Sequence, residues 1–438
     1  MEALIMTLQL ILSLSILVVL HEFGHFIAAR AFGIKVEKFY MFFDAWGFKL
    51  FSFKKGDTEY GIGWLPLGGY VKIAGMIDES MDKEQLKKPA EDWEFRSKPA
   101  WQRLIVMIGG VTMNVILGII IFSFNIAYFE KAYIPMEEIN KTGIYAYDTG
   151  RDLGFETGDK ILAVNDKKVV RFKDAASLTV LFGAKVTIER NGTQMDILVP
   201  DSTYRTYKTS HHHLYGLENF SFTVDSIPEG TNAAKAGLQI GDRFVSINGK
   251  TITSYGPFKE ELQKLKNKTA SFLVKRNQTL DTLKIAVDSI GRLGFFPTKP
   301  KIITKEYTLT DAIVYGTSDA MEAMIVNIKG FGKIFNGQEK ATESLQGPIS
   351  IAKMFGPVWD WEKFWRLTGM ISMILAFMNI LPIPALDGGH VVFALYEIIT
   401  RRKPSDKFLE YAQVVGMVIL LALMVFAFGN DLFKIFFK

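Results

Sequence analysis

Residues 4–25 read LIMTLQLILSLSILVVLHEFGH, and this stretch decides how the whole chain is interpreted. Its first part, residues 4–20, is uncharged and close to the roughly 20 residues that a helix needs to cross a bilayer. The apolar run resumes after HEFGH and ends at Arg30. A signal peptide is the alternative, but the run is long and no basic segment precedes it. We therefore predict a membrane-spanning helix that carries two histidines and a glutamate.

Three further runs are uncharged and long enough to span a bilayer, at residues 104–129, 367–386 and 411–429. The sequence therefore predicts four spanning helices. Of the 438 residues, 49% are hydrophobic and 22% are charged, which excludes a disordered chain, a coiled coil and a highly charged nucleic-acid binder. Cysteine is absent, so any soft-metal site must use His, Asp or Glu.

Lysine and arginine beside the spans predict the orientation of the chain. Three basic clusters flank the spans: Arg30, Lys35 and Lys38; Arg96, Lys98 and Arg103; and Arg401, Arg402, Lys403 and Lys407. All three lie on one side of the membrane if both termini are outside. Residues 130–366 then lie outside as well.

The outside region contains an internal repeat. Four residues recur 83 positions later, namely Gly154, Gly158, Asp159 and Asn165 as Gly237, Gly241, Asp242 and Asn248. Each copy leads to a strand-like run that ends in a turn, at 186–193 and 272–279. Two copies of one small β-rich domain are the simplest account, and the turn followed by a strand resembles PDZ domains.

Residues 310–336 have apolar side chains at the three-to-four-residue spacing of an amphipathic helix. Such a stripe packs on a domain core or lies along a membrane surface. The sequence favours neither alternative.

The HEFGH segment is an HExxH motif with the spacing of a zinc site. On a helix, His21 and His25 lie one turn apart on the same face, where both imidazoles can reach one zinc ion. Glu22 is rotated by about 100° from His21, beside the metal rather than on it, where it can accept a proton from a water. Ionisable side chains inside an apolar span are costly unless they have partners or a metal.

A third ligand must come from elsewhere in the chain, and NILPIPALDGGH at 379–390 is the candidate segment. Pro382 and Pro384 interrupt the third apolar run, and Asp387 stands at the start of a new helical run. His390 is the alternative ligand, and a helix N-cap is the alternative role for Asp387.

Together these motifs resemble the site-2 proteases, which are intramembrane zinc metalloproteases, and the resemblance covers essentially the whole chain. It implies Zn²⁺ as cofactor, His21, His25 and Asp387 as its ligands and Glu22 as the catalytic base. It also implies that Asn379 lies near the metal and contacts the substrate. Residues 66–73 (PLGGYVKI) resemble the family's membrane-dipping hairpin, which makes Gly69 and Tyr70 substrate-binding candidates, and Gly110 with Asn114 resembles a GxxxN motif in the second span.

The resemblance also implies an architecture, a polytopic α-helical membrane protein with about four spans and two β-rich PDZ-like domains between the second and third. The expected domains are a membrane half at 1–130, PDZ-like domains at 131–215 and 216–300, an amphipathic connector at 301–366 and a second membrane half at 367–438. The expected location is a bacterial inner membrane, with the PDZ-like domains in the periplasm and the active site towards the cytoplasm.

The implied reaction is hydrolysis of a peptide bond in or near the transmembrane segment of a single-pass protein. An anti-sigma factor or a remnant signal peptide is the expected partner besides the lipid bilayer, and no nucleic acid is expected. A membrane-anchored PDZ scaffold that binds protein tails without proteolysis is the main alternative. A metal transporter is a second one, but it leaves Glu22 unexplained. We expect His211–His213 to form an exposed loop between the two repeats.

Overall fold

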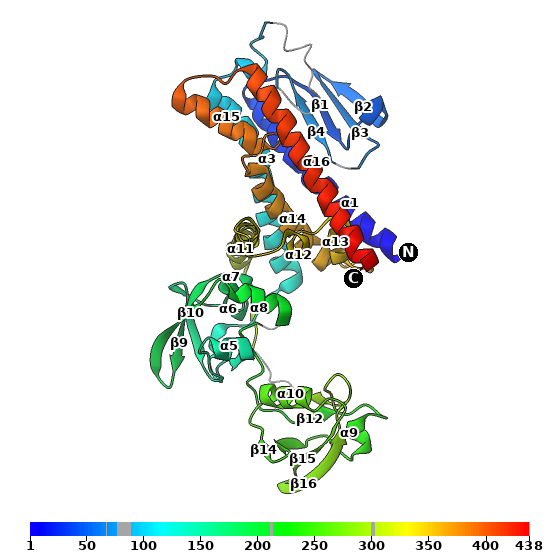
Figure 1. Ribbon diagram of the computed structural model, residues 1–438, viewed down its shortest axis with the longest axis vertical. Helices are drawn as coiled ribbons and strands as arrows, with labels where there is room; N and C mark the ends of the chain where they lie inside the picture. Colours follow the sequence, from blue (N-terminus) through cyan, green and yellow to red (C-terminus); the bar gives the residue numbers. More distant parts are fainter. Residues whose placement is uncertain (67, 77–88, 211–212, 299–302, 438) are drawn as a thin grey trace. The chain divides into compact units, whose positions relative to one another are not determined.

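The computed structural model describes the chain except residues 67, 77–88, 211–212, 299–302 and 438. The chain divides into two compact units. The first unit combines Met1–Lys131 with Tyr307–Lys438, and the second is Ala132–Glu306. The elements of both units are labelled in Figure 1.

Long helices form most of the first unit. They are α1 (Glu2–Ala31), α3 (Ala100–Asn125), α11 (Leu309–Phe335), α14 (Trp361–Ile380), α15 (Asp387–Thr400) and α16 (Asp406–Phe437). In the described part of the chain, three helical stretches are long and apolar enough to span a membrane: Glu2–Ala31, Ala100–Glu130 and Lys407–Phe436. Helix α14 covers much of the run at 367–386 but ends at Ile380, before the two prolines. The fourth span therefore stays a prediction.

Small and polar residues join these helices. A Cβ added to Gly24 of α1 would collide with the backbone of Gly109 in α3, so the two helices cross in backbone contact. Hydroxyl groups on α14 hydrogen-bond across to other helices. The Thr368 hydroxyl donates to Ser13 Oγ at 3.0 Å, and the Ser372 hydroxyl donates to the Asn114 carbonyl at 2.8 Å. These bonds satisfy polar groups that would otherwise be costly in an apolar setting.

A four-stranded sheet follows α1 and packs against it. Its strands are β1 (Val36–Met41), β2 (Lys49–Lys55), β3 (Thr58–Gly63) and β4 (Tyr70–Ile73), in the order β2-β3-β1-β4. Strand β1 pairs in parallel with β3 and antiparallel with β4. Its core joins Val36 and Ile73 to Ala29 of α1 and Val106 of α3. Strand β4 is thus an edge strand beside the helix that carries the HExxH motif.

The helix expected at 310–336 is α11, and it packs against α3 and α14. Its buried positions include Ala312, Gly316 and Ala320, whereas Ile325, Ile328 and Phe335 of the apolar stripe are at least 40% exposed. The small residues therefore make the helix contact, and much of the large apolar stripe stays exposed. Two short helices, α12 (Ala341–Ser344) and α13 (Pro348–Phe355), connect α11 to α14.

The second unit consists of two similar β-rich modules. The first module contains α4 (Met136–Ile139), β6 (Tyr145–Ala146), α5 (Asp148–Asp152), β7 (Lys160–Val164), β8 (Lys167–Lys168), α6 (Phe172–Ala175), α7 (Leu178–Leu181), β9 (Ala184–Arg190), β10 (Thr193–Val199), α8 (Thr203–Ser210) and β11 (Tyr215–Gly216). The second contains β12 (Val224–Ser226), α9 (Asn232–Lys235), β13 (Arg243–Ile247), β14 (Lys250–Thr251), α10 (Tyr255–Lys264), β15 (Thr269–Arg276), β16 (Thr279–Ala286) and β17 (Phe296–Pro297). A short pair, β5 (Ala132–Tyr133) with β18 (Lys305–Glu306), joins the two ends of the unit.

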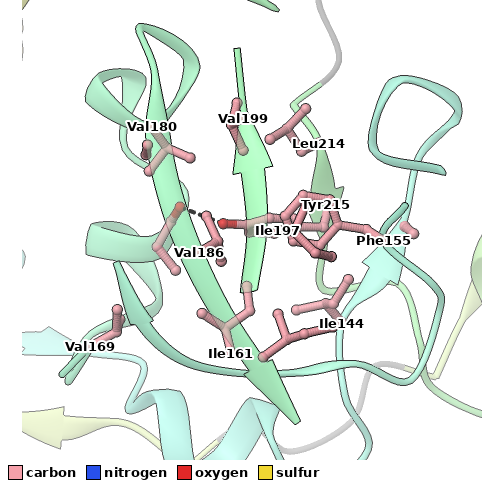
Figure 2. Packing of buried hydrophobic residues seen from close by; sticks show 14 of the residues in the cluster. Ile144, Phe155, Ile161, Val169, Val180, Val186, Ile197, Val199, Leu214 and Tyr215 are labelled. Atoms are coloured by element: carbon pink, nitrogen blue, oxygen red, sulfur yellow. Dashed lines mark hydrogen bonds between the residues drawn. The ribbon is translucent and has the colours of Figure 1, made fainter. Parts of the chain in front are cut away.

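Each module is built on a sheet of the same strand order. The order is β10-β9-β7-β8 in the first module and β14-β13-β15-β16 in the second. Figure 2 shows the core of the first module, where residues such as Ile161, Val186 and Tyr215 pack together. The Tyr215 hydroxyl donates to the Ala175 carbonyl at 2.8 Å, which satisfies the polar end of this buried ring.

The repeated glycine and aspartate residues have the same structural role in both modules. Asp159 and Asp242 are 1% and 0% exposed, and each carboxylate binds one arginine, Arg190 or Arg276, at 2.7–2.8 Å. Each arginine also donates to the carbonyl of the first repeated glycine, Gly154 at 2.7 Å or Gly237 at 3.0 Å. These repeated residues therefore stabilise the fold of each module.

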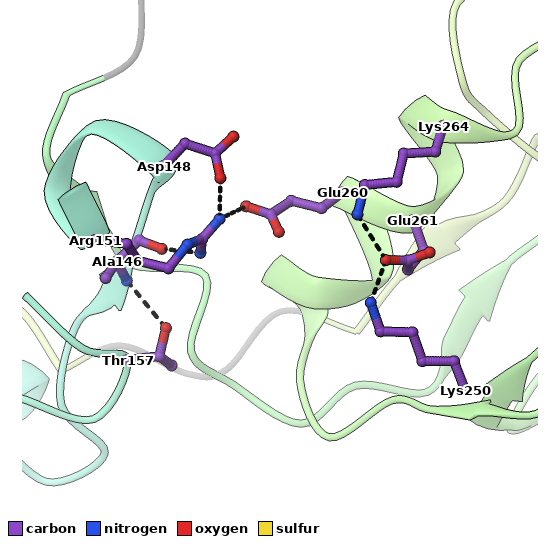
Figure 3. A network of polar contacts seen from close by, with 8 residues as sticks. All are labelled: Ala146, Asp148, Arg151, Thr157, Lys250, Glu260, Glu261 and Lys264. Carbon is purple, nitrogen blue, oxygen red and sulfur yellow. Dashed lines mark hydrogen bonds and ion pairs between the residues drawn. The ribbon is translucent and has the colours of Figure 1, made fainter.

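Ion pairs and hydrogen bonds also join the two modules. Arg151 of α5 contacts Asp148 and forms an ion pair with Glu260 of α10 at 2.7 Å (Figure 3). The Tyr147 hydroxyl donates to Glu218 at 2.7 Å. These side chains are partly exposed, so the ion pair is expected to contribute well under about 1 kcal/mol.

Candidate metal centre

Helix α1 places two imidazoles side by side. His21 and His25 lie one turn apart, and their Nε2 atoms are 3.2 Å from each other. The side chains are 12% and 6% exposed. The two nitrogens therefore point to the same place, as the HExxH spacing predicts.

Asp387 joins them from the other end of the chain. Its Oδ2 atom lies 3.2 Å from Nε2 of His21 and 3.3 Å from Nε2 of His25. Asp387 is the first residue of α15, whose N-cap is Leu386, so the N-cap role considered for Asp387 is wrong. The preceding turn is tight, because Ala385 has φ 82° and a Cβ on Gly388 would collide with the Ile380 and Leu381 carbonyls.

The three atoms form a nearly equilateral triangle that fits a zinc ion. Tetrahedral ligands about 2.0–2.1 Å from zinc are about 3.3 Å apart, and the three edges here measure 3.2–3.3 Å. Two imidazoles and one carboxylate also suit zinc chemically, and a fourth position is left for water or substrate. Among the described residues, these are the only three His, Asp or Glu side chains that converge in this way.

A second layer of contacts orients the two imidazoles. The Nδ1–H of His25 donates to the Val106 carbonyl at 2.8 Å, which leaves its Nε2 lone pair for a metal. Asn114 is fully buried, with Nδ2 3.1 Å from Nδ1 of His21 and Oδ1 without a hydrogen-bond partner among the described residues. Exchanging these two amide atoms satisfies Oδ1, because it then accepts from His21 Nδ1–H, and it fixes the same tautomer as in His25. A Cβ on Gly110 would collide with both imidazoles, so this position of α3 requires glycine.

Asn379 lies at the rim of this site. Its Nδ2 is 3.3 Å from Nε2 of His21, and the side chain is partly buried near the end of α14. Glu22 follows His21 on α1 and is also partly buried. An amide donor and a carboxylate therefore adjoin the three converging side chains.

The other candidate residues lie elsewhere. His390 points into a separate cavity with Met107 and Phe393 and does not join the triangle. Gly69 packs against Val18, one turn before His21 on α1, so the hairpin approaches the site. The Tyr70 side chain packs within the sheet region, because its hydroxyl donates to Asp44 at 2.8 Å and its ring stacks on Tyr40.

The histidine run at 211–213 is not part of the site. His211 and His212 lie outside the described residues. His213 lies between the rings of Tyr207 and Tyr215, with Nδ1 buried, so the expectation of an exposed loop is wrong at this position. Burial lowers the pKa of His213 to about 4, although a hydrogen bond to the Ser177 carbonyl opposes the shift.

Sequence reasoning missed the contribution of Val106 to the site. The contact is made by a backbone carbonyl, which any residue type would supply, so the sequence carries no signal for it. Gly110 and Asn114 were found only through the GxxxN resemblance, and the structure gives that spacing a physical reason.

Known proteins resemble this chain over nearly its full length. The model of peptidase family M50 matches residues 9–423. The regulator of sigma-E protease RseP of Escherichia coli is 28% identical over 457 residues, covering 96% of this chain and 97% of that protein. A relative in Haemophilus influenzae, named regulator of sigma E protease, is 28% identical over 97% of this chain and 98% of its own length.

A third relative, from Rickettsia conorii, is named as a candidate zinc metalloprotease. It is 30% identical over 434 residues, covering 97% of this chain and 98% of that protein. The resemblance to site-2 proteases is thereby confirmed. The chain belongs to peptidase family M50 and is a metalloprotease of the site-2 type.

Proposed function

We propose that this chain is a zinc protease that hydrolyses a peptide bond in or beside the transmembrane segment of a single-pass membrane protein. The observation that carries the proposal is the triangle of His21, His25 and Asp387, whose edges of 3.2–3.3 Å fit one zinc ion. These residues lie in or next to apolar helices, so the reaction takes place at membrane depth.

Each neighbouring side chain has a role in this mechanism. When bound, zinc polarises the scissile carbonyl and acidifies a nearby water. The Glu22 carboxylate takes the proton from the attacking water and delivers it to the leaving nitrogen. The Asn379 amide, 3.3 Å from His21 Nε2, donates to the oxyanion that develops on the scissile carbonyl.

The substrate has to present an extended backbone, because a helix hides its peptide groups. Strand β4 is at one end of the sheet and pairs only with β1 among the described strands. An unwound substrate segment adds to its open edge. The glycine at 69 supports this, because it brings the strand close to α1. Tyr70 contributes through its backbone, since its side chain is held by Asp44.

The proposed substrates are anti-sigma-factor-like single-pass proteins and remnant signal peptides. The names of the Escherichia coli and Haemophilus influenzae relatives support the first class. We place the protein in a bacterial inner membrane, with the active site towards the cytoplasm. We further propose that the two modules are periplasmic PDZ domains, and the repeated strand order supports their common origin.

Comparative proteomics of membrane peptides tests the activity. Cells that make the wild-type chain should accumulate fragments with ends inside single-pass segments, and cells that make Glu22→Gln should not. If both cell lines yield the same fragments while both proteins carry zinc, the chain does not cleave membrane segments under those conditions. The scaffold alternative would then explain the modules better.

Thiol labelling tests the orientation, because the chain has no cysteine of its own. Lys54 and Lys250 are both exposed on the protein, in the first and second unit respectively. In intact cells, a cysteine at position 250 should react with an impermeant reagent and one at position 54 should not. Both should react after the membrane is permeabilised. The reverse pattern in intact cells would overturn the orientation.

A further inference from the structure

A cavity lies in the first unit, apart from the three converging side chains. It has a volume of about 60 Å³. Its walls come from the 3₁₀ turn η2 (Phe95–Ser97), from α3, from α15 and from the start of α16. None of the proposed catalytic residues lines it, so the mechanism above does not use it.

One part of the lining is cationic. It includes Arg103 and Lys403, with His390 beside them. Arg96 also lines the cavity, but it forms an ion pair with the buried Glu94 at 2.5 Å. Arg103 uses Nη2 in an ion pair with Glu397 at 2.6 Å and Nε in a hydrogen bond to the Lys98 carbonyl at 3.0 Å. Its Nη1 makes neither contact. Lys403 is exposed and has no ion-pair partner among the described residues.

The other part of the lining is apolar. It is formed by Phe95, Met107, Phe393 and Leu409. The guanidinium of Arg103 lies over the Phe95 ring, 6.0 Å from its centroid, so the charged and apolar parts meet there. Helix α15 borders the cavity with one face, while Val392 and Ile399 on the same helix are 45% and 78% exposed. A ligand in this place therefore meets both charge and hydrocarbon.

The position of the cavity along α3 adds a further constraint. Arg103 precedes Gly110, which touches the two imidazoles, by seven residues, or about 10 Å along the helix. Arg103 and Lys403 belong to two of the basic clusters that predict the cytoplasmic side. The fold brings these two clusters together at one cavity.

We propose that this cavity holds the phosphate of an anionic phospholipid, in the leaflet that the orientation proposed above makes cytoplasmic. Arg103 Nη1 and Lys403 Nζ contact the phosphate, and an acyl chain lies against Phe393 and Leu409. Basic pockets between spanning helices on the cytoplasmic side bind anionic headgroups for this reason. A free phosphate would use the cations alone, whereas a lipid also uses the apolar wall. The site adds a ligand to the protein and does not depend on its peptidase activity.

Native mass spectrometry of the full chain in detergent tests the site, with phosphatidylglycerol as the probe. Lys403→Gln removes a charge from an exposed position and should weaken lipid retention about fivefold. Ala394→Leu fills the cavity from α15 and should abolish the retained lipid. Arg402→Gln is the matched control, because it removes the same charge beside the cavity without lining it. It should retain lipid as the wild type does.

Two further measurements distinguish a lipid phosphate from free inorganic phosphate. Phosphatidylcholine should not be retained, and millimolar inorganic phosphate should not displace phosphatidylglycerol. If inorganic phosphate displaces phosphatidylglycerol, the cavity binds free anions and the lipid proposal is wrong. The proposal fails if Lys403→Gln and Ala394→Leu, both still folded and zinc-loaded, retain phosphatidylglycerol like the wild type. It also fails if a photo-crosslinker at position 393 captures a peptide substrate in place of lipid.

Discussion

The two units each bury aspartates, but they give them different partners. In the modules, Asp159 and Asp242 each bind one arginine from a strand of the same module. In the first unit, Asp387 faces two imidazoles that belong to a helix at the opposite end of the sequence. All three carboxylates are largely removed from solvent.

The partner of a buried aspartate shows whether the residue stabilises the fold or binds a ligand. An arginine is always charged, so an aspartate paired with it within one module is neutralised without any further ligand. Two imidazoles supply neutral lone pairs, and a carboxylate between them is balanced best by a bound cation. A buried aspartate is therefore informative only together with the residues around it.

The largest expected effect comes from adding one methyl group at the metal centre. Gly110→Ala would push a Cβ into both imidazoles, and we expect zinc affinity to fall about 100-fold or more, with loss of cleavage. Zinc titration of the purified variant measures this. Gly330→Ala is the control, since a Cβ there meets nothing within 4 Å. Normal zinc affinity in Gly110→Ala would mean that the imidazoles do not need this space.

A module aspartate should show the opposite pattern. Asp242→Asn leaves Arg276 without its buried partner and should lower the stability of the second module by about 3 kcal/mol. Zinc content should not change. Hydrogen exchange at β13 and β15 measures the stability. Asp281→Asn is the control, because Asp281 contacts the same arginine at 3.5 Å from a half-exposed position and should matter little. Zinc loss in Asp242→Asn would break the distinction between the units.

A smaller effect is expected from pH in the first module. The pKa of His213 is lowered to about 4, below its ordinary value near 6.5. Between these values the unfolded chain binds a proton that the folded module does not, so stability falls as the pH drops. From pH 6.5 to 4.5 the loss should be about 2 kcal/mol. Hydrogen exchange at β9 measures this loss of stability. His213→Phe should remove the part of the pH dependence that comes from His213. An unchanged pH dependence in that variant would contradict the assignment.

Much of the metal site was predictable because its residues follow local rules. The HExxH spacing places His21 and His25 on one helix face, and the prolines before Asp387 mark the start of a new helix. The contact between Asp387 and the histidines follows from no local rule. It depends on how α1, α3 and α15 pack, so the sequence left His390 open as an alternative ligand. The resemblance to site-2 proteases added to the argument that an ionisable residue at membrane depth is a functional candidate, and it selected Asp387.

The fold was predictable to a similar extent. Repeated glycines and aspartates indicated two similar modules. The arginines that bind Asp159 and Asp242 recur as well, each before an asparagine in the runs at 186–193 and 272–279, but no local rule pairs them with the aspartates. The stripe of α11 indicated a helix but not its packing face, because small residues such as Gly316 make the contact with α3 while Ile325 and Phe335 remain exposed. Periodicity finds a helix, whereas the face that packs depends on the neighbouring helix.

The zinc content of three variants distinguishes the proposed zinc ligands from the proposed base Glu22 and from His390. Glu22→Gln should keep about one zinc per chain and lose cleavage, because Glu22 is proposed as a base and not as a ligand. Asp387→Ala should lose both zinc and cleavage, and His390→Ala should keep its zinc. Elemental analysis of each purified protein gives the answer. The account is contradicted if Asp387→Ala retains full zinc while His390→Ala loses it.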